Sequence, residues 1–84
     1  MEEFTNVNLA TFTHFLLRNF RVQHISHTIN TCRLLLIDSG KEVEFVDCEG
    51  ILKCNGICFD LNNNFTEIEI VKYFYYIIDI VLEH

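Results

Sequence analysis

The sequence of 84 residues contains no proline and no tryptophan, and it has only three glycines. Linkers and low-complexity segments are usually rich in proline, glycine or a few repeated residue types, so nothing here indicates a boundary between domains. Half of the residues are hydrophobic, which is typical of a folded domain rather than a disordered chain. We therefore expect residues 1–84 to form a single small domain with one modest core.

Long uncharged apolar runs are also missing. The most apolar segment, residues 65–82, is interrupted by four charged side chains, whereas a membrane-spanning helix needs about 20 predominantly apolar residues. The first three residues include two glutamates, where a secretory signal would carry positive charge. We therefore expect a cytoplasmic protein with no membrane partner.

Acidic residues are absent from much of the first half of the chain. Between Phe4 and Ile37 there are three arginines and no aspartate or glutamate, whereas ten acids and three lysines follow from Asp38 onward. The formal net charge is −6. Nucleic-acid-binding domains usually present a net basic stripe, so we expect no direct binding of nucleic acid. Negative charge instead suits a basic protein partner, such as a protein that itself handles nucleic acid.

The sequence also lacks the short motifs of catalysis. It has no glycine-rich phosphate loop, no paired-carboxylate signature and no serine nucleophile motif. A cysteine nucleophile would need a histidine nearby in space, and no short motif surrounds any of the cysteines. We therefore expect no enzymatic activity and no cofactor.

Four cysteines occur, and in an intracellular protein we expect them to be free thiols. They are Cys32, Cys48, Cys54 and Cys58. With His24 and His27 they supply the residue types of a zinc site, and Cys54 and Cys58 have a permitted spacing. The expected hairpin, however, places these two thiols on opposite faces. We expect no bound metal, and a zinc-binding or thiol-active protein is the less favoured alternative.

Two segments have the periodicity of amphipathic helices. In the first, residues 8–20, the apolar positions at helical spacing are Leu9, Phe12, Leu16 and Phe20. Asn6 or Asn8 is a suitable N-cap, because its short side chain can accept a free backbone N–H of the first turn. The second helix begins at the capping box Thr66-x-x-Glu69 and runs to the C-terminus.

The residues between these helices have strand character. Runs rich in β-branched and aliphatic residues predict strands at residues 22–26, 31–37 and 42–48. Asn55-Gly56 between two apolar runs is the favoured type I′ hairpin turn, and it places Cys54 opposite Ile57. We therefore predict an α+β domain. It consists of an antiparallel β-meander of three to five strands, flanked by an N-terminal and a C-terminal helix that pack mainly on one face.

The C-terminal helix is apolar over far more of its circumference than a helix that only covers a sheet requires. We expect one flank to seal the core, formed by Val71, Phe74, Ile78 and Leu82. A second apolar flank would remain uncovered, and exposed apolar patches of this kind mark interaction sites. We predict that this flank is a dimer or partner interface, formed by Tyr73, Tyr76, Ile77 and Ile80. Burial of the same flank under the first helix is the alternative.

Five carboxylates follow one another along the expected central hairpin: Asp38, Glu42, Glu44, Asp47 and Glu49. One interpretation is an acidic surface that occupies a basic groove of a partner. The other is a solvated strand face that keeps the sheet soluble and protects its edge.

Together these features predict a non-enzymatic protein-interaction module that acts by occupying the surface of a partner protein, as a homodimer formed through its C-terminal helix. Small size and acidity without active-site chemistry suit an inhibitor or accessory factor, including those encoded by phages and viruses. The alternative is a structural subunit of a larger hetero-complex that docks through the same helix.

Overall fold

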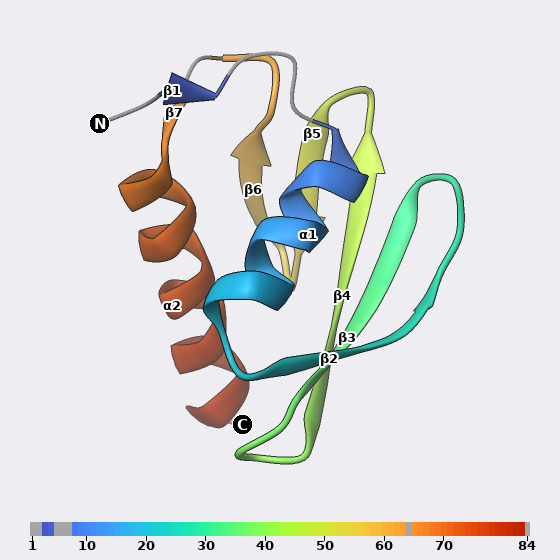
Figure 1. Cartoon of the computed structure of the whole chain (residues 1–84), viewed down its shortest axis with the longest axis vertical. Coiled ribbons are helices and arrows are strands. Elements are labelled where there is room, and N and C mark those ends of the chain that lie inside the picture. Colours follow the sequence, from blue (N-terminus) through green and yellow to red (C-terminus); the bar gives the residue numbers. More distant parts are fainter. Residues whose placement is uncertain (1–2, 5–7, 64, 84) are drawn as a thin grey trace.

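The computed structural model describes residues 3–4, 8–63 and 65–83. These residues form two helices, a five-stranded antiparallel sheet and a short two-stranded ribbon (Figure 1). The helices are α1 (Leu9–Asn19) and α2 (Glu67–Glu83). The sheet strands are β2 (Val22–His27), β3 (Thr31–Leu36), β4 (Lys41–Cys48), β5 (Ile51–Cys54) and β6 (Ile57–Asp60). In the ribbon, β1 (Glu3–Phe4) pairs antiparallel with β7 (Phe65–Thr66).

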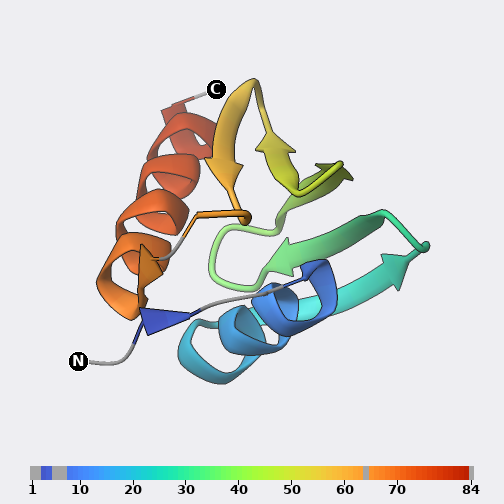
Figure 2. The ribbon, with the colours of Figure 1, turned by 90° about the horizontal axis from the view of Figure 1, so that it is seen from above.

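The five sheet strands are neighbours in the same order as they occur in the sequence, and every pair is antiparallel. This is the meander that the sequence predicts, and the α+β fold class is confirmed. The sheet is strongly curved, and both helices lie on its concave side (Figure 2). No helix of the described residues covers the opposite face of the sheet, and we call it the open face. The ribbon of β1 and β7 was not foreseen.

Helix α1 begins where the sequence indicates. The Oδ1 atom of Asn8 accepts a hydrogen bond from the Thr11 backbone N–H at 2.9 Å, so Asn8 is the N-cap. Asn6, the other candidate, lies outside the described residues. The face with Leu9, Phe12 and Leu16 is buried against the sheet, whereas the polar stripe of the helix faces solvent.

The Asn55-Gly56 hairpin is also confirmed. Both residues have positive φ, 52° and 81° respectively, as a type I′ turn requires. The pairing of Cys54 with Ile57 and of Lys53 with Cys58 follows directly from this turn. Cys54 is consequently buried, while Cys58 is exposed on the open face.

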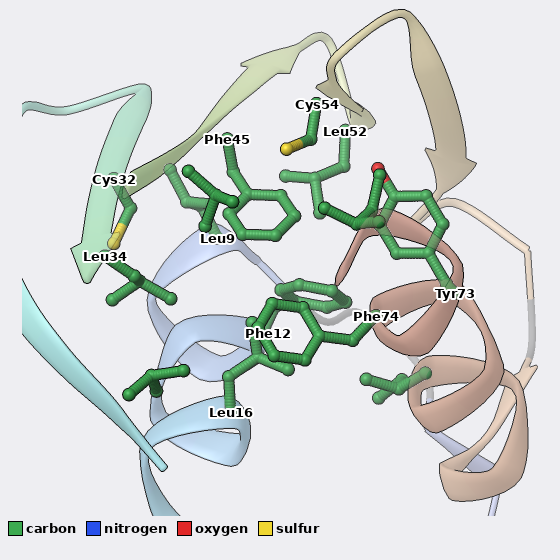
Figure 3. Close-up of a cluster of buried hydrophobic side chains, with 14 of the residues drawn as sticks. Leu9, Phe12, Leu16, Cys32, Leu34, Phe45, Leu52, Cys54, Tyr73 and Phe74 are labelled. Atoms are coloured by element: carbon green, nitrogen blue, oxygen red, sulfur yellow. The ribbon is translucent and has the colours of Figure 1, made fainter. Parts of the chain in front are cut away.

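Aromatic rings from both helices and the sheet form the centre of the core (Figure 3). Phe12 of α1, Phe45 of β4 and Phe74 of α2 are fully buried. The ring centroids of Phe12 and Phe45 are 5.7 Å apart in an edge-to-face arrangement, and those of Phe45 and Phe74 are 6.1 Å apart. Each such ring contributes roughly 1.5–3 kcal/mol through burial. Contacts through Phe45 therefore join both helices to the same strand.

Helix α2 is held to the sheet at its C-terminal end by a residue that lies far away in the sequence. Its first turn carries two glutamates, and its last turn carries no basic side chain. Instead, Nζ of Lys41, the first residue of β4, donates a hydrogen bond to the carbonyl oxygen of Val81 at 3.0 Å. At the other end, Oε1 of Glu69 accepts a hydrogen bond from the Thr66 backbone N–H at 3.4 Å, one half of the expected capping box.

The four cysteines are free thiols. Cys32 and Cys54 are buried, and Cys48 and Cys58 are exposed. None of the helices within the described ranges has the length and apolar character to cross a membrane.

Candidate interaction surface

The expected orientation of α2 is wrong for two of its four predicted interface residues. Tyr73 is only 7% exposed and Ile77 is fully buried, so both belong to the core rather than to an uncovered flank. The buried face of the helix is formed by Ile70, Tyr73, Phe74 and Ile77. Tyr76 is exposed and Ile80 is partly buried, and their role in an interface stays a prediction.

The buried position of Tyr73 has a clear chemical reason. Its ring contacts Phe59 at a centroid distance of 5.0 Å, and its hydroxyl donates a hydrogen bond to the carbonyl oxygen of Ile57 at 2.8 Å. The ring therefore contributes apolar area while its polar atom finds a partner at the edge strand β6 (Figure 3). Burial raises the pKa of the Tyr73 hydroxyl well above its ordinary range.

The face of α2 that points away from the core carries an unusual row of side chains. Ile68, Tyr75 and Leu82 are 44%, 56% and 50% exposed, although each is a large apolar or aromatic residue. At 100° per residue they fall on one line with Lys72 and Asp79, within about 80° of arc. We call these five residues the outer stripe. It lies opposite the buried face, and Tyr76, also exposed, adjoins it.

The two charges of the outer stripe are available for an external contact. In the ranges that the structure describes, the intrachain ion pairs involve Arg21 or Arg33, and neither Lys72 nor Asp79 takes part in one. Lys72 lies one turn before Tyr75 and Asp79 one turn after it. The stripe is therefore an apolar row with one free positive and one free negative charge.

A groove of about 390 Å³ adjoins the outer stripe. Its apolar lining includes Phe20 at the end of α1 and Tyr75, Ile78 and Leu82 of α2, and the paired Arg21 and Asp38 also border it. The Phe20 ring contacts Tyr75 edge-on at a centroid distance of 5.4 Å. We call it the aromatic groove. Two residues of the outer stripe, Tyr75 and Leu82, thus also line a concave apolar surface that can receive a side chain.

The acidic residues of the central hairpin do not gather on one surface. Asp38 precedes β4 and Glu49 follows it, so the two lie in turns at opposite ends of that strand (Figure 1). Glu42 and Glu44 point to the open face. The backbone N–H of Gly50 donates a hydrogen bond to Oδ1 of Asp47 at 2.8 Å, which stabilises a turn.

Two arginines from the acid-free segment form ion pairs with three of these five carboxylates. Nε of Arg21 lies 2.9 Å from Oδ1 of Asp38. Arg33 lies between Glu42 and Glu44, with nitrogen–oxygen distances of 3.8 Å and 3.3 Å. A role of these carboxylates in partner binding stays a prediction, but the hairpin is less negative than its sequence indicates.

A second, smaller cavity of about 250 Å³ lies between α1 and the β2–β3 hairpin, and it is lined in part by His14, His24 and His27. Nδ1 of His27 lies 3.0 Å from Nε2 of His24. Cys32 lies on the cavity wall with Thr13, and burial raises the pKa of its thiol, against a smaller lowering by the Thr13 hydroxyl. Over the residues that can be described, no three histidine, cysteine or acidic side chains are grouped so that they could hold a metal ion.

Comparisons with protein-family models, with curated proteins and with solved structures gave no match to this chain.

The outer stripe could have been found in the sequence by a different reading of the same helix. The buried residues Ile70, Tyr73, Phe74 and Ile77 have the spacing i, i+3, i+4, i+7 of a core-facing stripe. Because twelve of the seventeen residues of α2 are apolar or aromatic, another choice of face also satisfies the pattern. The charged pair Lys72 and Asp79 was the better guide, since it points directly away from the core.

Proposed function

We propose that this protein is a non-enzymatic protein-interaction module whose contact surface is the outer stripe of α2 together with the adjoining aromatic groove. The observation that carries this proposal is the exposure of Ile68, Tyr75 and Leu82 in one row on the face of α2 that points away from the core. Scattered apolar residues are common on protein surfaces, but a row of them next to an aromatic-lined groove is typical of interaction sites.

Self-association is the simplest form of this contact, because two-fold dimers are the commonest oligomers. As a homodimer the protein would act as an inhibitor or accessory factor that occupies a partner's surface. The net charge of −6 favours a basic protein as that partner. The four free thiols suit the cytoplasm, where disulfides are rare. The alternative proposal is a structural subunit whose outer stripe docks on a different chain.

The test is the molar mass of the purified protein by light scattering over a hundredfold range of concentration. The variants are Tyr75→Glu, in the middle of the outer stripe, and Ile29→Glu. Ile29 is fully exposed at the tip of the β2–β3 hairpin and serves as the matched control. We expect a dimer for the wild type and Ile29→Glu, and a folded monomer for Tyr75→Glu. A wild type that stays monomeric throughout would overturn self-association and leave the subunit alternative.

A further inference from the structure

The outer stripe has an internal symmetry about Tyr75. Ile68 lies seven residues before Tyr75 and Leu82 lies seven residues after it, and all three are exposed. With a rise of 1.5 Å per residue, the two aliphatic side chains lie about 10 Å from Tyr75 in opposite directions along the helix. The apolar part of the stripe therefore has the same order, aliphatic then aromatic then aliphatic, in both directions along the helix.

We propose that two copies of this chain pair through α2 in antiparallel orientation, with the two-fold axis passing next to Tyr75. This pairing presupposes the proposed function and specifies its geometry. A two-fold interface requires a surface that is complementary to itself, so that residue i meets j and residue j meets i. Around Tyr75, Ile68 of one copy falls opposite Leu82 of the other, and the tyrosines of the two copies meet at the axis.

The free charges favour the antiparallel arrangement over the parallel one. Lys72 lies three residues before Tyr75, and Asp79 lies four residues after it. An antiparallel pair brings Lys72 of each copy to within about one residue, or 1.5 Å along the axis, of the level of Asp79 in the other copy. A parallel pair would place like charges side by side. The antiparallel pair thus forms two intermolecular ion pairs from side chains that have no ion-pair partner within the described part of one chain.

The aromatic groove extends this contact beyond the two helices. Leu82 and Tyr75 lie on the rim shared by the outer stripe and the groove, next to Ile78 and Phe20. Because Ile68 of the second copy falls opposite Leu82, it arrives at the mouth of the groove. At each end of the interface, Ile68 of one copy therefore packs on the aromatic groove of the other. This contact improves the shape complementarity of the two surfaces, as interface cores require.

Charge reversal tests the orientation. We compare the dimer dissociation constant of the wild type with those of Lys72→Glu, Asp79→Lys and the double variant, by sedimentation at low salt. Each single variant turns two attractions into two repulsions, so we expect dimerisation to weaken about tenfold or more. The double variant restores opposite charges across the axis and is expected to recover most of the affinity.

The control is Lys53→Glu, which makes the same charge change on the open face of the sheet and is expected to leave the dissociation constant nearly unchanged. Equal dissociation constants for the wild type, the two single variants and the double variant would overturn the antiparallel pairing. If Tyr75→Glu still dissociated the dimer in that case, the contact through α2 would stand and only its orientation would be wrong. A monomeric wild type would overturn both.

Disulfide trapping gives a second, independent measurement. The background is Cys48→Ser with Cys58→Ser, which removes the two exposed thiols. Bridged cysteines need Cα atoms no more than about 7 Å apart, whereas two copies of residue 68 would be about 21 Å apart in the antiparallel pair. Under mild oxidation we expect Tyr75→Cys to cross-link to itself. Ile68→Cys and Leu82→Cys should cross-link only when mixed. Self-cross-linking of Ile68→Cys would show a parallel pair and overturn the proposal.

Discussion

At the scale of single residues, identical side chains on α2 have opposite environments. Tyr73 is buried with its hydroxyl bonded to the Ile57 carbonyl, whereas Tyr75 and Tyr76 are more than half exposed. A tyrosine can serve in a core only where a polar partner lies within reach of its hydroxyl. In α2 that partner is supplied by the last strand of the sheet, sixteen residues earlier in the chain.

The buried thiol of Cys54 in β5 is expected to make the stability of the fold fall in alkali. Burial raises the pKa of the Cys54 thiol from 9.0 to about 11. The folded state therefore keeps a proton that the unfolded state loses, so this contribution to stability is complete below pH 9 and declines as the pH rises toward 11. We expect the urea midpoint to fall over this interval, and to fall less in Cys54→Ala. Tyr73 adds to the decline above pH 10, because its pKa is also raised.

Cys58→Ala is the control for this measurement, because that thiol is exposed on the open face. It should show the same alkaline decline as the wild type. If the urea midpoint fell equally with pH in Cys54→Ala and Cys58→Ala, the Cys54 thiol would not be the cause of the alkaline decline.

At the scale of elements, the sequence predicts best those features that depend on only a few neighbouring residues. Asn8 caps α1 and Asn55-Gly56 turns the last hairpin, because each needs only a few neighbouring residues. The register of β5 and β6 follows from that turn alone. The orientation of α2 is different, since a helix that is apolar on most sides can seal a core with several faces. In the structure, the face with Tyr73 is held against the sheet by its contacts with the Phe59 ring and the Ile57 carbonyl of β6, residues that lie far from α2 in the sequence.

Two turn glycines allow the cost of a strained backbone to be measured separately from the cost of a steric clash. Gly50 and Gly56 both have positive φ, but a Cβ added at Gly50 would clash with the Asn62 side chain, whereas one at Gly56 would meet nothing. We expect Gly56→Ala to cost about 1–2 kcal/mol of unfolding free energy through the left-handed backbone alone. Gly50→Ala should cost more, because it also displaces Asn62, whose Nδ2 donates to the Glu49 carbonyl.

Chemical denaturation of the two variants checks this order. Adding Asn62→Ala to Gly50→Ala removes the clash, so the double variant should be less destabilised than the sum of the two single effects. If the losses of unfolding free energy were strictly additive, the Asn62 side chain would move aside for the added Cβ without any cost in stability.

At the scale of the whole molecule, the uneven charge of the sequence is partly cancelled by folding. The acid-free segment between Phe4 and Ile37 supplies Arg21 and Arg33, and the acidic segment from Asp38 onward supplies Asp38, Glu42 and Glu44 as their partners. Exposed ion pairs of this kind contribute only about 0–1 kcal/mol each, so their main effect is on surface charge. The Arg33 pairs depend on the pairing of β3 with β4, and the Arg21–Asp38 pair depends on that of β2 with β3. A count of charges along the sequence therefore overstates the free negative charge of the hairpin.

Dimerisation should make the stability of the whole molecule depend on its concentration. A contact formed only by the folded chain stabilises it by mass action, so the thermal midpoint of the wild type should rise with protein concentration. At saturation each tenfold increase contributes about 1.4 kcal/mol per mole of dimer. Tyr75→Glu should melt at the same temperature at every concentration, and so serves as the reference. A wild-type midpoint that is equally constant would contradict the dimer.

The hydrogen bond from Lys41 to the Val81 carbonyl has a consequence for how the outer stripe can be studied. The last turn of α2, which carries Leu82, receives its positive charge from the start of β4 and not from its own sequence. A synthetic peptide covering only the helix would lack this lysine and would fray at that end. It would therefore be a poor surrogate for the intact protein in competition assays, unless a cation were built into its last turn.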